Sequence, residues 1–373
     1  MRETLQTDWG ESMKKQSIAV LFGGLSTEHE ISLLSAASLL AHMDGEKYDV
    51  YPIGITRDGR WLYFESRAYD LLPEGKWENS GCTLPAHLSP DRGVGGLLIF
   101  RPEGMQRIAI DCVLPVLHGR GGEDGAIQGL LEYSGIPYVG CGIAASACAM
   151  DKSLTKQIID HTPVRQAAYA LCRRAEFERD PGAVCRRVRE QVGAFPVFIK
   201  PCSSGSSVGV HKAQDERELE DGLRDAFTFD TKVIVEEFIS GREIEVAVIG
   251  NDAPHATPAG EIAPAEEFYT FDAKYVLGTS SLFIPARLRE EEMARVRQAA
   301  LTVYTALDCA GLARVDFFCR ADGTVIFNEI NTFPGFTAIS MYPKLMEHEG
   351  VDYPALIDRL IALALERAEG QRG

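Results

Sequence analysis

The sequence predicts a chain of mixed α/β and α+β structure that opens with a parallel-sheet unit and continues into two further units. Three observations support this prediction. Apolar strands alternate with helical segments near the N-terminus, a glycine–serine loop joins two strands in the middle, and two strands near the C-terminus carry charged residues at alternate positions. Strands that alternate with helices form parallel sheets in α/β units. We expect the three units at residues 14–140, 141–231 and 232–370.

The first unit begins with a short apolar run at residues 17–24 that ends in two glycines, which is typical of a buried parallel strand. Residues 29–43 have apolar side chains at helical spacing and predict a helix. The same reasoning predicts further strands at residues 49–55, 108–117 and 136–139 and a helix at residues 126–133. The long apolar strand ends at His118, where a glycine-rich loop begins.

The second unit is expected to begin with a helix at residues 146–160. It continues with strands at 195–200 and 208–212 and a charged helix at 215–227. In the third unit, one face of a helix is apolar through Met293, Val296, Ala300, Val303 and Leu307. The remaining elements of this unit are strands at 232–239, 243–249, 312–318 and 324–330 and a closing helix at 352–368.

The net charge indicates which partners are unfavourable, and the cysteines indicate the redox compartment. The formal net charge is −16, so a phosphate backbone or an anionic membrane surface is an unfavourable partner. A few local cations are still enough to bind a small anion such as ATP. Nine cysteines form no CxxC pair, which is typical of reduced thiols in the cytoplasm.

Two strands near the C-terminus carry the strongest chemical signal. Residues two apart in a strand share a face, so Arg314 and Asp316 point the same way, as do Glu329 and Asn331. If the strands pair, two carboxylates and an amide oxygen meet beside an arginine. Such hard oxygen ligands suit Mg²⁺. The alternative is that these residues form a solvated face.

Three loops follow strand ends and are rich in glycine. The loop at 200–209 begins with Lys200 and offers backbone donors and hydroxyls to a phosphate. The loop at 117–125 leads into a helix. The loop at 22–30 carries the acidic residues Glu28 and Glu30, so it suits an ammonium group better than an anion, and we expect Glu30 to act by favouring the helix N-terminus. Each loop alone is also compatible with an ordinary surface turn. The glycine spacing of the loop at 200–209 matches neither the GxxxxGK[ST] phosphate loop nor the GxGxxG dinucleotide loop.

In combination and in this order, these segments resemble the D-alanine–D-alanine ligase family of ATP-grasp enzymes. The motifs that carry the resemblance are GGLSTEHEIS, HGRGGEDGAIQG, MDK, IKPCSSGSSVG, EEFISGREIEV, FYTFDAKY, ARVDFF and NEINTFPGFTAISMYP. The resemblance implies a Rossmann-like N-terminal domain followed by a two-domain ATP-grasp fold that holds ATP between its halves. It also implies that ATP phosphorylates one D-alanine, whose acyl phosphate is attacked by the amine of a second.

The resemblance further implies a role for each matching residue. The residues matched to ATP contacts are Lys152, Lys200, Ser207, Glu236, Glu243 and Lys274. Those matched to the amino-acid substrates or the tetrahedral intermediate are Glu28, His118, Arg314, Gly335, Ser340 and Met341. Ser206 and Tyr275 match a hydrogen-bonded pair that links Glu28 to a loop at residues 266–279, which we expect to act as a lid. Asp316, Glu329 and Asn331 match the ligands of two Mg²⁺ (or Mn²⁺) ions.

Thr270 departs from the family pattern, which has Asp at this position. Within the family, the alternatives for the second substrate are D-serine and D-lactate, as in glycopeptide resistance. Met341 and the Lys274–Tyr275 pair favour D-alanine, because the resistance ligases usually carry an arginine or a histidine at the corresponding places. The resemblance also implies a cytoplasmic homodimer that makes a peptidoglycan precursor.

Overall fold

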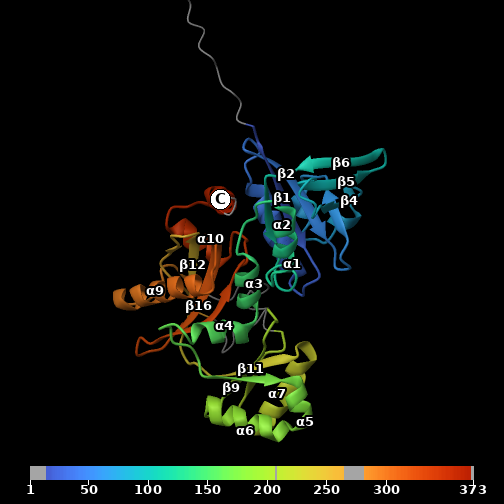
Figure 1. Cartoon of the computed structure of the whole chain (residues 1–373). Coiled ribbons are helices and arrows are strands. Elements are labelled where there is room, and N and C mark those ends of the chain that lie inside the picture. Colours follow the sequence, from blue (N-terminus) through green and yellow to red (C-terminus); the bar gives the residue numbers. More distant parts are fainter. Residues whose placement is uncertain (1–13, 206–207, 264–280, 371–373) are drawn as a thin grey trace, which may run out of the picture.

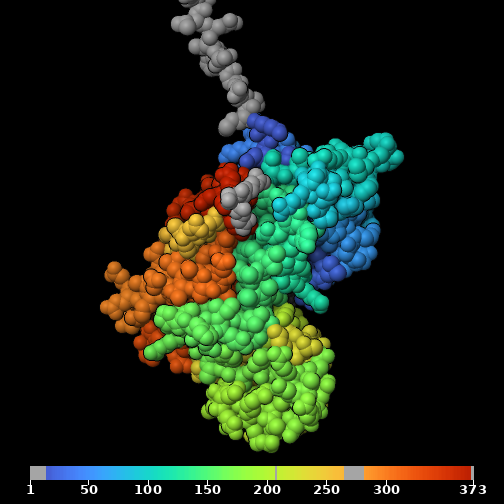
Figure 2. Space-filling model, viewed as in Figure 1, coloured from blue at the N-terminus to red at the C-terminus, as the bar shows by residue number. Residues whose placement is uncertain are grey.

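The computed structural model describes residues 14–205, 208–263 and 281–370. Within these ranges the strands form three sheets, each built from strands that follow one another along the chain (Figure 1). In the space-filling view the unit around the second sheet projects from a body formed by the other two (Figure 2). None of the helices in the described ranges combines the length and the apolar character needed to cross a bilayer.

The first sheet has seven strands in the order β6-β5-β4-β3-β2-β1-β7. Its strands are β1 (Gln16–Gly23), β2 (Tyr48–Ile55), β3 (Trp61–Phe64), β4 (Thr83–Leu88), β5 (Gly96–Arg101), β6 (Gly104–Ala109) and β7 (Cys112–Val116). The helices of this unit are α1 (His29–His42), η1 (Tyr69–Leu71), η2 (Trp77–Asn79) and α2 (Ala126–Ser134). Strand β1 is parallel to both β2 and β7, which confirms the predicted parallel unit. Strands β3 to β6 extend it as an antiparallel meander.

The single strand expected at residues 108–117 is wrong. The structure divides it between β6 and β7, which lie at opposite edges of the sheet. Only Ile110 and Asp111 separate the two strands, so the sheet must curl back on itself. The break is fixed at Asp111, whose backbone N–H donates to Ser17 O at 2.9 Å and whose side chain accepts from Ser17 N at 2.8 Å.

The second sheet is antiparallel, in the order β10-β9-β11-β8. Its strands are β8 (Tyr169–Arg173), β9 (Val197–Pro201), β10 (His211–Ala213) and β11 (Lys232–Glu237), with helices α5 (Arg174–Arg179), α6 (Pro181–Val192) and α7 (Glu216–Phe229) packed against it. Strand β11 lies between β9 and β8, although the expected unit boundary at 231/232 falls just before it. The division into units at 140/141 and 231/232 stays a prediction.

The third sheet follows the order β15-β14-β12-β16-β17, with β13 paired to β12. Its strands are β12 (Arg242–Gly250), β13 (His255–Ala256), β14 (Gly260–Ala263), β15 (Ser281–Phe283), β16 (Gly311–Cys319) and β17 (Val325–Asn331). The helices that surround it are α3 (Ile143–Met150), α4 (Lys152–Ile159), α9 (Glu290–Ala306), α10 (Met341–His348) and α11 (Tyr353–Gly370). The helix expected at 146–160 is therefore broken at Asp151, whose side chain caps α4 by accepting from Ser153 N and Leu154 N.

The alternation of side chains along β12 places charged residues at one end of this sheet. Ile244, Val246 and Val248 share one face and are fully buried in a cluster with the apolar side of α9. On the other face, Ala247 and Ile249 pack with α10 and α11. The two positions that precede them on that face are Glu243 and Glu245. The period of two thus places acidic side chains at the end of the strand that α10 and α11 leave uncovered.

Helix α11 also joins the first and third sheets into one core. Its Leu356, Leu360 and Ile361 belong to a cluster that contains strand residues of both sheets. Tyr48 Oη donates to Asp358 at 2.8 Å, and Arg367 Nη2 donates to Tyr138 O at 2.9 Å. Helix α11 is therefore bonded to the unit of the first sheet while it packs in the core shared with the third.

Candidate active site

A cavity of about 1370 Å³ lies between the second and third sheets and is closed on one side by loops of the first. Most of the described residues singled out from the sequence line it. They are Glu28, His118, Lys152, Lys200, Glu236, Glu243, Arg314, Asp316, Glu329, Asn331 and Gly335. These residues come from strands, helices and loops around all three sheets, so the cavity exists only in the assembled chain.

The charged face of the third sheet forms one wall. Asp316 pairs in register with Glu329 on β17 and with Glu245 on β12. The Arg314 guanidinium donates to both carboxylate oxygens of Asp316, from Nε at 2.8 Å and from Nη2 at 2.7 Å. Arg314 Nε also lies 3.1 Å from Glu245 Oε2. The two strands pair as the sequence predicts, and the arginine lies between two buried carboxylates.

The oxygen atoms on this wall suit a hard cation in kind. Asn331 Nδ2 donates to Asp316 Oδ2 at 3.1 Å, so the amide is adjacent to the carboxylate of Asp316. Two carboxylates and an amide on paired strands are ligands that Mg²⁺ accepts, with further positions left for phosphate oxygens. Among the described residues, however, no three His, Cys, Asp or Glu side chains are grouped closely enough to hold a metal ion. The side chains therefore suit Mg²⁺ by type, but the described residues are not grouped around a metal position.

A buried ion triad forms the opposite wall, in the second sheet. Glu236 on β11 is 4% exposed and pairs with Lys200 on β9 at 2.6 Å and with Lys156 on α4. Burial alone would raise the pKa of the Glu236 carboxyl, but the two lysines outweigh it and lower the pKa to about 2. Lys152, one turn before Lys156, donates from Nζ to Ser204 O at 2.8 Å in the glycine–serine loop.

The third wall consists of loops that meet at Glu28. A Cβ on Gly119 would lie 2.6 Å from Glu28 Oε2, and one on Gly205 would lie 2.5 Å from it. Since real Cβ atoms do not approach so closely, the glycines at both positions allow the loops to reach this carboxylate. The glycine-rich loops of the sequence therefore converge on one acid.

His118 lies beside this meeting point and is buried. Its Nδ1 is 3.1 Å from Phe333 O, and its Nε2 is 3.1 Å from Ser35 Oγ. Burial lowers the pKa of His118 below its usual value of 6.5. A neutral imidazole with Nδ1 protonated fits both neighbours, because a carbonyl oxygen can only accept.

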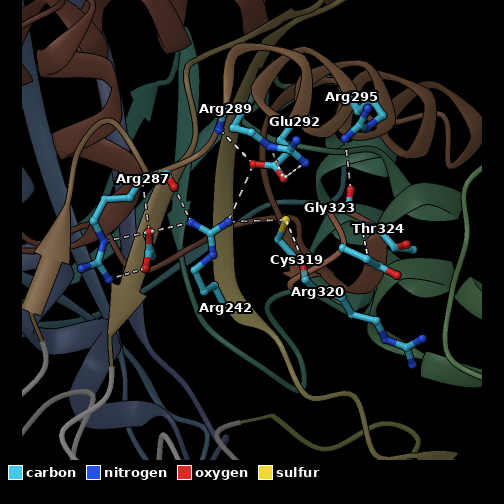
Figure 3. A network of polar contacts seen from close by, with 11 residues as sticks. Arg242, Arg287, Arg289, Glu292, Arg295, Cys319, Arg320, Gly323 and Thr324 are labelled. Atoms are coloured by element: carbon cyan, nitrogen blue, oxygen red, sulfur yellow. Dashed lines mark hydrogen bonds and ion pairs between the residues drawn. The ribbon is translucent and has the colours of Figure 1, made fainter.

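A polar network at the rim of the cavity fixes the start of β12 (Figure 3). Arg242 Nη1 lies 3.7 Å from Glu261 Oε2, and Arg242 Nη2 lies 3.8 Å from Glu292 Oε2. Arg287 and Arg289 pair with the same two acids at 2.5 Å and 2.7 Å. The network connects β12, β14 and α9 one residue before Glu243, so it positions the strand that carries Glu243 and Glu245.

Some predicted residues lie elsewhere. Met341 is 5% exposed and belongs to the cluster around α11, where it packs against Gly260. Ser340 precedes α10, and its Oγ accepts from Thr337 N at 3.1 Å. Neither residue is among those that line the cavity. Ser206, Ser207, Thr270, Lys274 and Tyr275, and the predicted lid at 266–279, lie outside the described residues.

The cavity lining also includes charged residues to which sequence reasoning gave no role, among them Glu123, Lys156 and Glu245. Glu245 was detectable, because it follows Glu243 by two positions on the same strand. Lys156 was detectable from its position one helical turn after Lys152. Glu123 stood within the glycine-rich loop, but one of its two contacts, to Phe333 N, is 210 residues away in the sequence.

Two family models and several relatives match most of this chain. The family model described as D-ala D-ala ligase N-terminus matches residues 17–141, and that described as D-ala D-ala ligase C-terminus matches residues 158–362. The D-alanine–D-alanine ligase of Caldicellulosiruptor bescii is 47% identical over 95% of this chain and 96% of its own. That of Clostridium acetobutylicum is 46% identical over 95% and 99%.

Solved structures resemble this fold over nearly the whole chain. The VanG D-Ala:D-Ser ligase from Enterococcus faecalis has a TM-score of 0.85 and 38% identity, covering 94% of this chain and 100% of its own. The D-alanine–D-alanine ligase from Coxiella burnetii has a TM-score of 0.82 and 35% identity, covering 96% and 97%.

Proposed function

This chain belongs to the D-alanine–D-alanine ligase family, and on that basis we propose that it joins two D-alanine molecules at the expense of ATP. The cavity that brings together Glu28, Arg314 and the Lys156–Glu236–Lys200 triad is the observation that best supports this function. It offers an acid for an ammonium group, a cation for a developing oxyanion and buried cations for a nucleotide in one enclosed space.

The triad and its neighbours form the nucleotide half of the proposed site. Lys200 and Glu236 would bind on the adenine side, and Glu243 on β12 would bind the ribose. Lys152, which already contacts the glycine–serine loop, would reach a phosphate. Asp316, Glu329 and Asn331 would hold Mg²⁺, which supplies positive charge against the phosphate oxygens as the γ-phosphoryl group is transferred.

The other half of the cavity would bind the amino acids. Glu28 would hold the ammonium of the first D-alanine, with the neutral His118 beside its carboxylate. A carboxylate oxygen of this D-alanine attacks the γ-phosphorus, ADP leaves, and an acyl phosphate forms. The amine of the second D-alanine then attacks the acyl carbon, and a proton and inorganic phosphate leave with formation of the peptide bond.

Arg314 and the backbone N–H of Gly335 would stabilise the oxyanion of the tetrahedral intermediate. Glu245 and Asp316 hold the guanidinium in place before the substrate arrives. Such preorganised donors accelerate acyl transfer because they need no reorganisation when charge develops. The roles of Ser206, Ser207, Lys274, Tyr275 and Ser340 stay predictions from the family resemblance, as do the homodimer and the cytoplasmic location.

D-alanine–D-serine ligation is the second candidate function, because the solved structure of the VanG D-Ala:D-Ser ligase resembles this chain with a TM-score of 0.85. We favour D-alanine as second substrate, since relatives at 46–47% identity are D-alanine–D-alanine ligases. The buried position of Met341 means that any effect of this residue on selectivity would act through packing of α10.

The test is competition at neutral pH among equal concentrations of D-alanine, D-serine and D-lactate, with product analysis by mass. We expect D-alanyl-D-alanine as the main product. A margin over D-serine of about 10² at most is expected, because a pocket shaped for a methyl group rejects an added hydroxyl weakly. If D-alanyl-D-serine or D-alanyl-D-lactate is the main product, D-serine or D-lactate is the preferred second substrate, and the ligase assignment is unchanged.

A further inference from the structure

Glu123 connects two loops that are far apart in the sequence. Its Oε2 accepts from Gly119 N at 2.7 Å, in the loop after β7. Its Oε1 accepts from Phe333 N at 3.1 Å, in the loop after β17. One carboxylate therefore joins the backbone of the first sheet's loop to the backbone of the third sheet's loop, and it lines the cavity while doing so.

A second connection runs parallel to the first. Phe336 N donates to Ser35 Oγ at 3.2 Å, Ser35 Oγ lies 3.1 Å from His118 Nε2, and His118 Nδ1 lies 3.1 Å from Phe333 O. With His118 neutral, every group in this chain has a partner of the right kind: the serine hydroxyl donates to Nε2, and Nδ1 donates to the carbonyl. Gly335 is thus bracketed on both sides by backbone groups that bond to the first sheet's unit.

The two loops carry the two halves of the proposed amino-acid site. Gly119 lies directly against Glu28, where an added Cβ would be 2.6 Å from Oε2. Gly335 lies two residues after Phe333 and carries the N–H assigned to the oxyanion. The distance between the ammonium site and the oxyanion donor therefore depends on the distance between Gly119 and Phe333, which Glu123 bridges.

We infer that Glu123 is a positioning residue that sets the separation between the first-substrate site at Glu28 and the oxyanion donor at Gly335. The inference rests on the proposed function, since it concerns the same site. Glu123 acts through Gly119 and Phe333 and needs no contact with the substrate. A misplacement of about 1 Å at a reacting centre can lower a rate by about 10², which is the scale of effect that such a bridge controls.

The bridge requires a side chain with two acceptor oxygens. A glutamine offers one oxygen and one NH₂ group, so it can accept from only one of the two backbone N–H groups and places a donor against the other. An aspartate keeps the charge but is one methylene shorter and cannot span both. Burial and the neighbouring charge of Glu28 raise the pKa of Glu123 to about 8, whereas the backbone hydrogen bonds from Gly119 and Phe333 lower the pKa, so the two bonds of the bridge favour the ionised side chain.

The adjacent Asp124 provides a matched control. Its carboxylate accepts from Gly121 N at 2.8 Å and from Ala126 N at 3.1 Å, both within its own loop. It does not line the cavity as Glu123 does. Asp124→Asn therefore perturbs the same loop by the same chemical change without touching the connection to Phe333.

The experiment measures kcat and the KM for ATP and for D-alanine in the wild type, Glu123→Gln, Glu123→Asp and Asp124→Asn. We expect both Glu123 variants to lose about 10² in kcat while their KM for ATP stays within about twofold, because the nucleotide site at Lys156 and Glu236 is untouched. Asp124→Asn should keep kcat within about threefold of the wild type.

Three outcomes would overturn the inference. If Glu123→Gln keeps wild-type kcat, no bridge is needed. If Glu123→Asp is active while Glu123→Gln is not, charge and not reach is what matters. If Asp124→Asn loses as much kcat as Glu123→Gln, the loop is merely structural. Should Glu123→Gln fail to fold, Glu123→Asp decides on its own by the same split between kcat and KM. A wild type that forms no D-alanyl-D-alanine would instead refute the proposed function.

Discussion

Replacing Glu236 by glutamine removes the one anion from a buried triad and should destabilise the fold strongly. The side chains of Glu236 and Lys156 are 6% and 3% exposed, so little solvent screens them. The pKa of Glu236 is lowered from 4.5 to about 2, which corresponds to roughly 3 kcal/mol at about 1.4 kcal/mol per pH unit. Removing one partner of a buried pair typically costs about 3–5 kcal/mol, because the other charge stays buried without compensation.

The assay is urea unfolding followed by far-UV circular dichroism. The described tryptophans, Trp61 and Trp77, belong to the first sheet's unit, so their fluorescence would not report on the second sheet. Because the folded pKa is below the unfolded one, the stabilisation is complete above about pH 4.5 and is lost only as the pH falls toward 2. The loss in Glu236→Gln should therefore be the same at pH 6 and pH 8.

Glu220→Gln is the control for this change. Glu220 pairs with Arg224 at 2.8 Å on α7, but the two side chains are 43% and 63% exposed. Exposed pairs contribute at most about 1 kcal/mol. We expect Glu236→Gln to lose about 3 kcal/mol or more and Glu220→Gln less than about 1 kcal/mol. Equal and small losses in both variants would refute the argument that the buried triad stabilises this unit.

Three further predictions concern the opposite side of the cavity. Arg314→Ala should lower kcat by about 10² to 10³ and raise the KM for ATP far less; normal turnover with weak ATP binding would make Arg314 a nucleotide contact. Glu329→Gln should greatly reduce turnover and raise the Mg²⁺ concentration for half-maximal rate while the thermal midpoint stays nearly constant, and wild-type activity at saturating Mg²⁺ would exclude a metal ligand. Since burial lowers the pKa of His118 below 6.5, its ring should be mainly neutral above pH 6.5 with Nδ1 protonated, which ¹⁵N NMR measures; a titration midpoint above pH 6.5 would contradict this.

The charged wall of the site could be predicted from the sequence because it depends on local geometry. Alternation in a strand places Arg314 with Asp316 and Glu329 with Asn331, and the two strands are neighbours along the chain. The fold class followed in the same way from the alternation of strands and helices, and the parallel pairing of β1 with β2 and β7 confirms it. The sequence pattern, however, did not predict that strands β3 to β6 extend the parallel unit as an antiparallel meander.

Contacts between distant segments could not be predicted. Lys156 and Glu236 meet only because α4 packs beside the second sheet, and Glu123 reaches Phe333 across 210 residues. Nothing near Met341 in the sequence indicates that its side chain turns into the core under Gly260 instead of toward the cavity. Burial of this kind is decided by how α10 and α11 pack, which a local pattern does not encode.

The central claim is that a carboxylate of D-alanine is activated by phosphoryl transfer from ATP within this cavity. The most direct test is a reaction with D-alanine labelled with ¹⁸O in both carboxylate oxygens, followed by mass analysis of the inorganic phosphate. Because one carboxylate oxygen forms the bond to phosphorus and leaves with it, each phosphate should carry one ¹⁸O atom, in equal amount to D-alanyl-D-alanine. Unlabelled phosphate would mean that ATP is hydrolysed by water and would contradict the account.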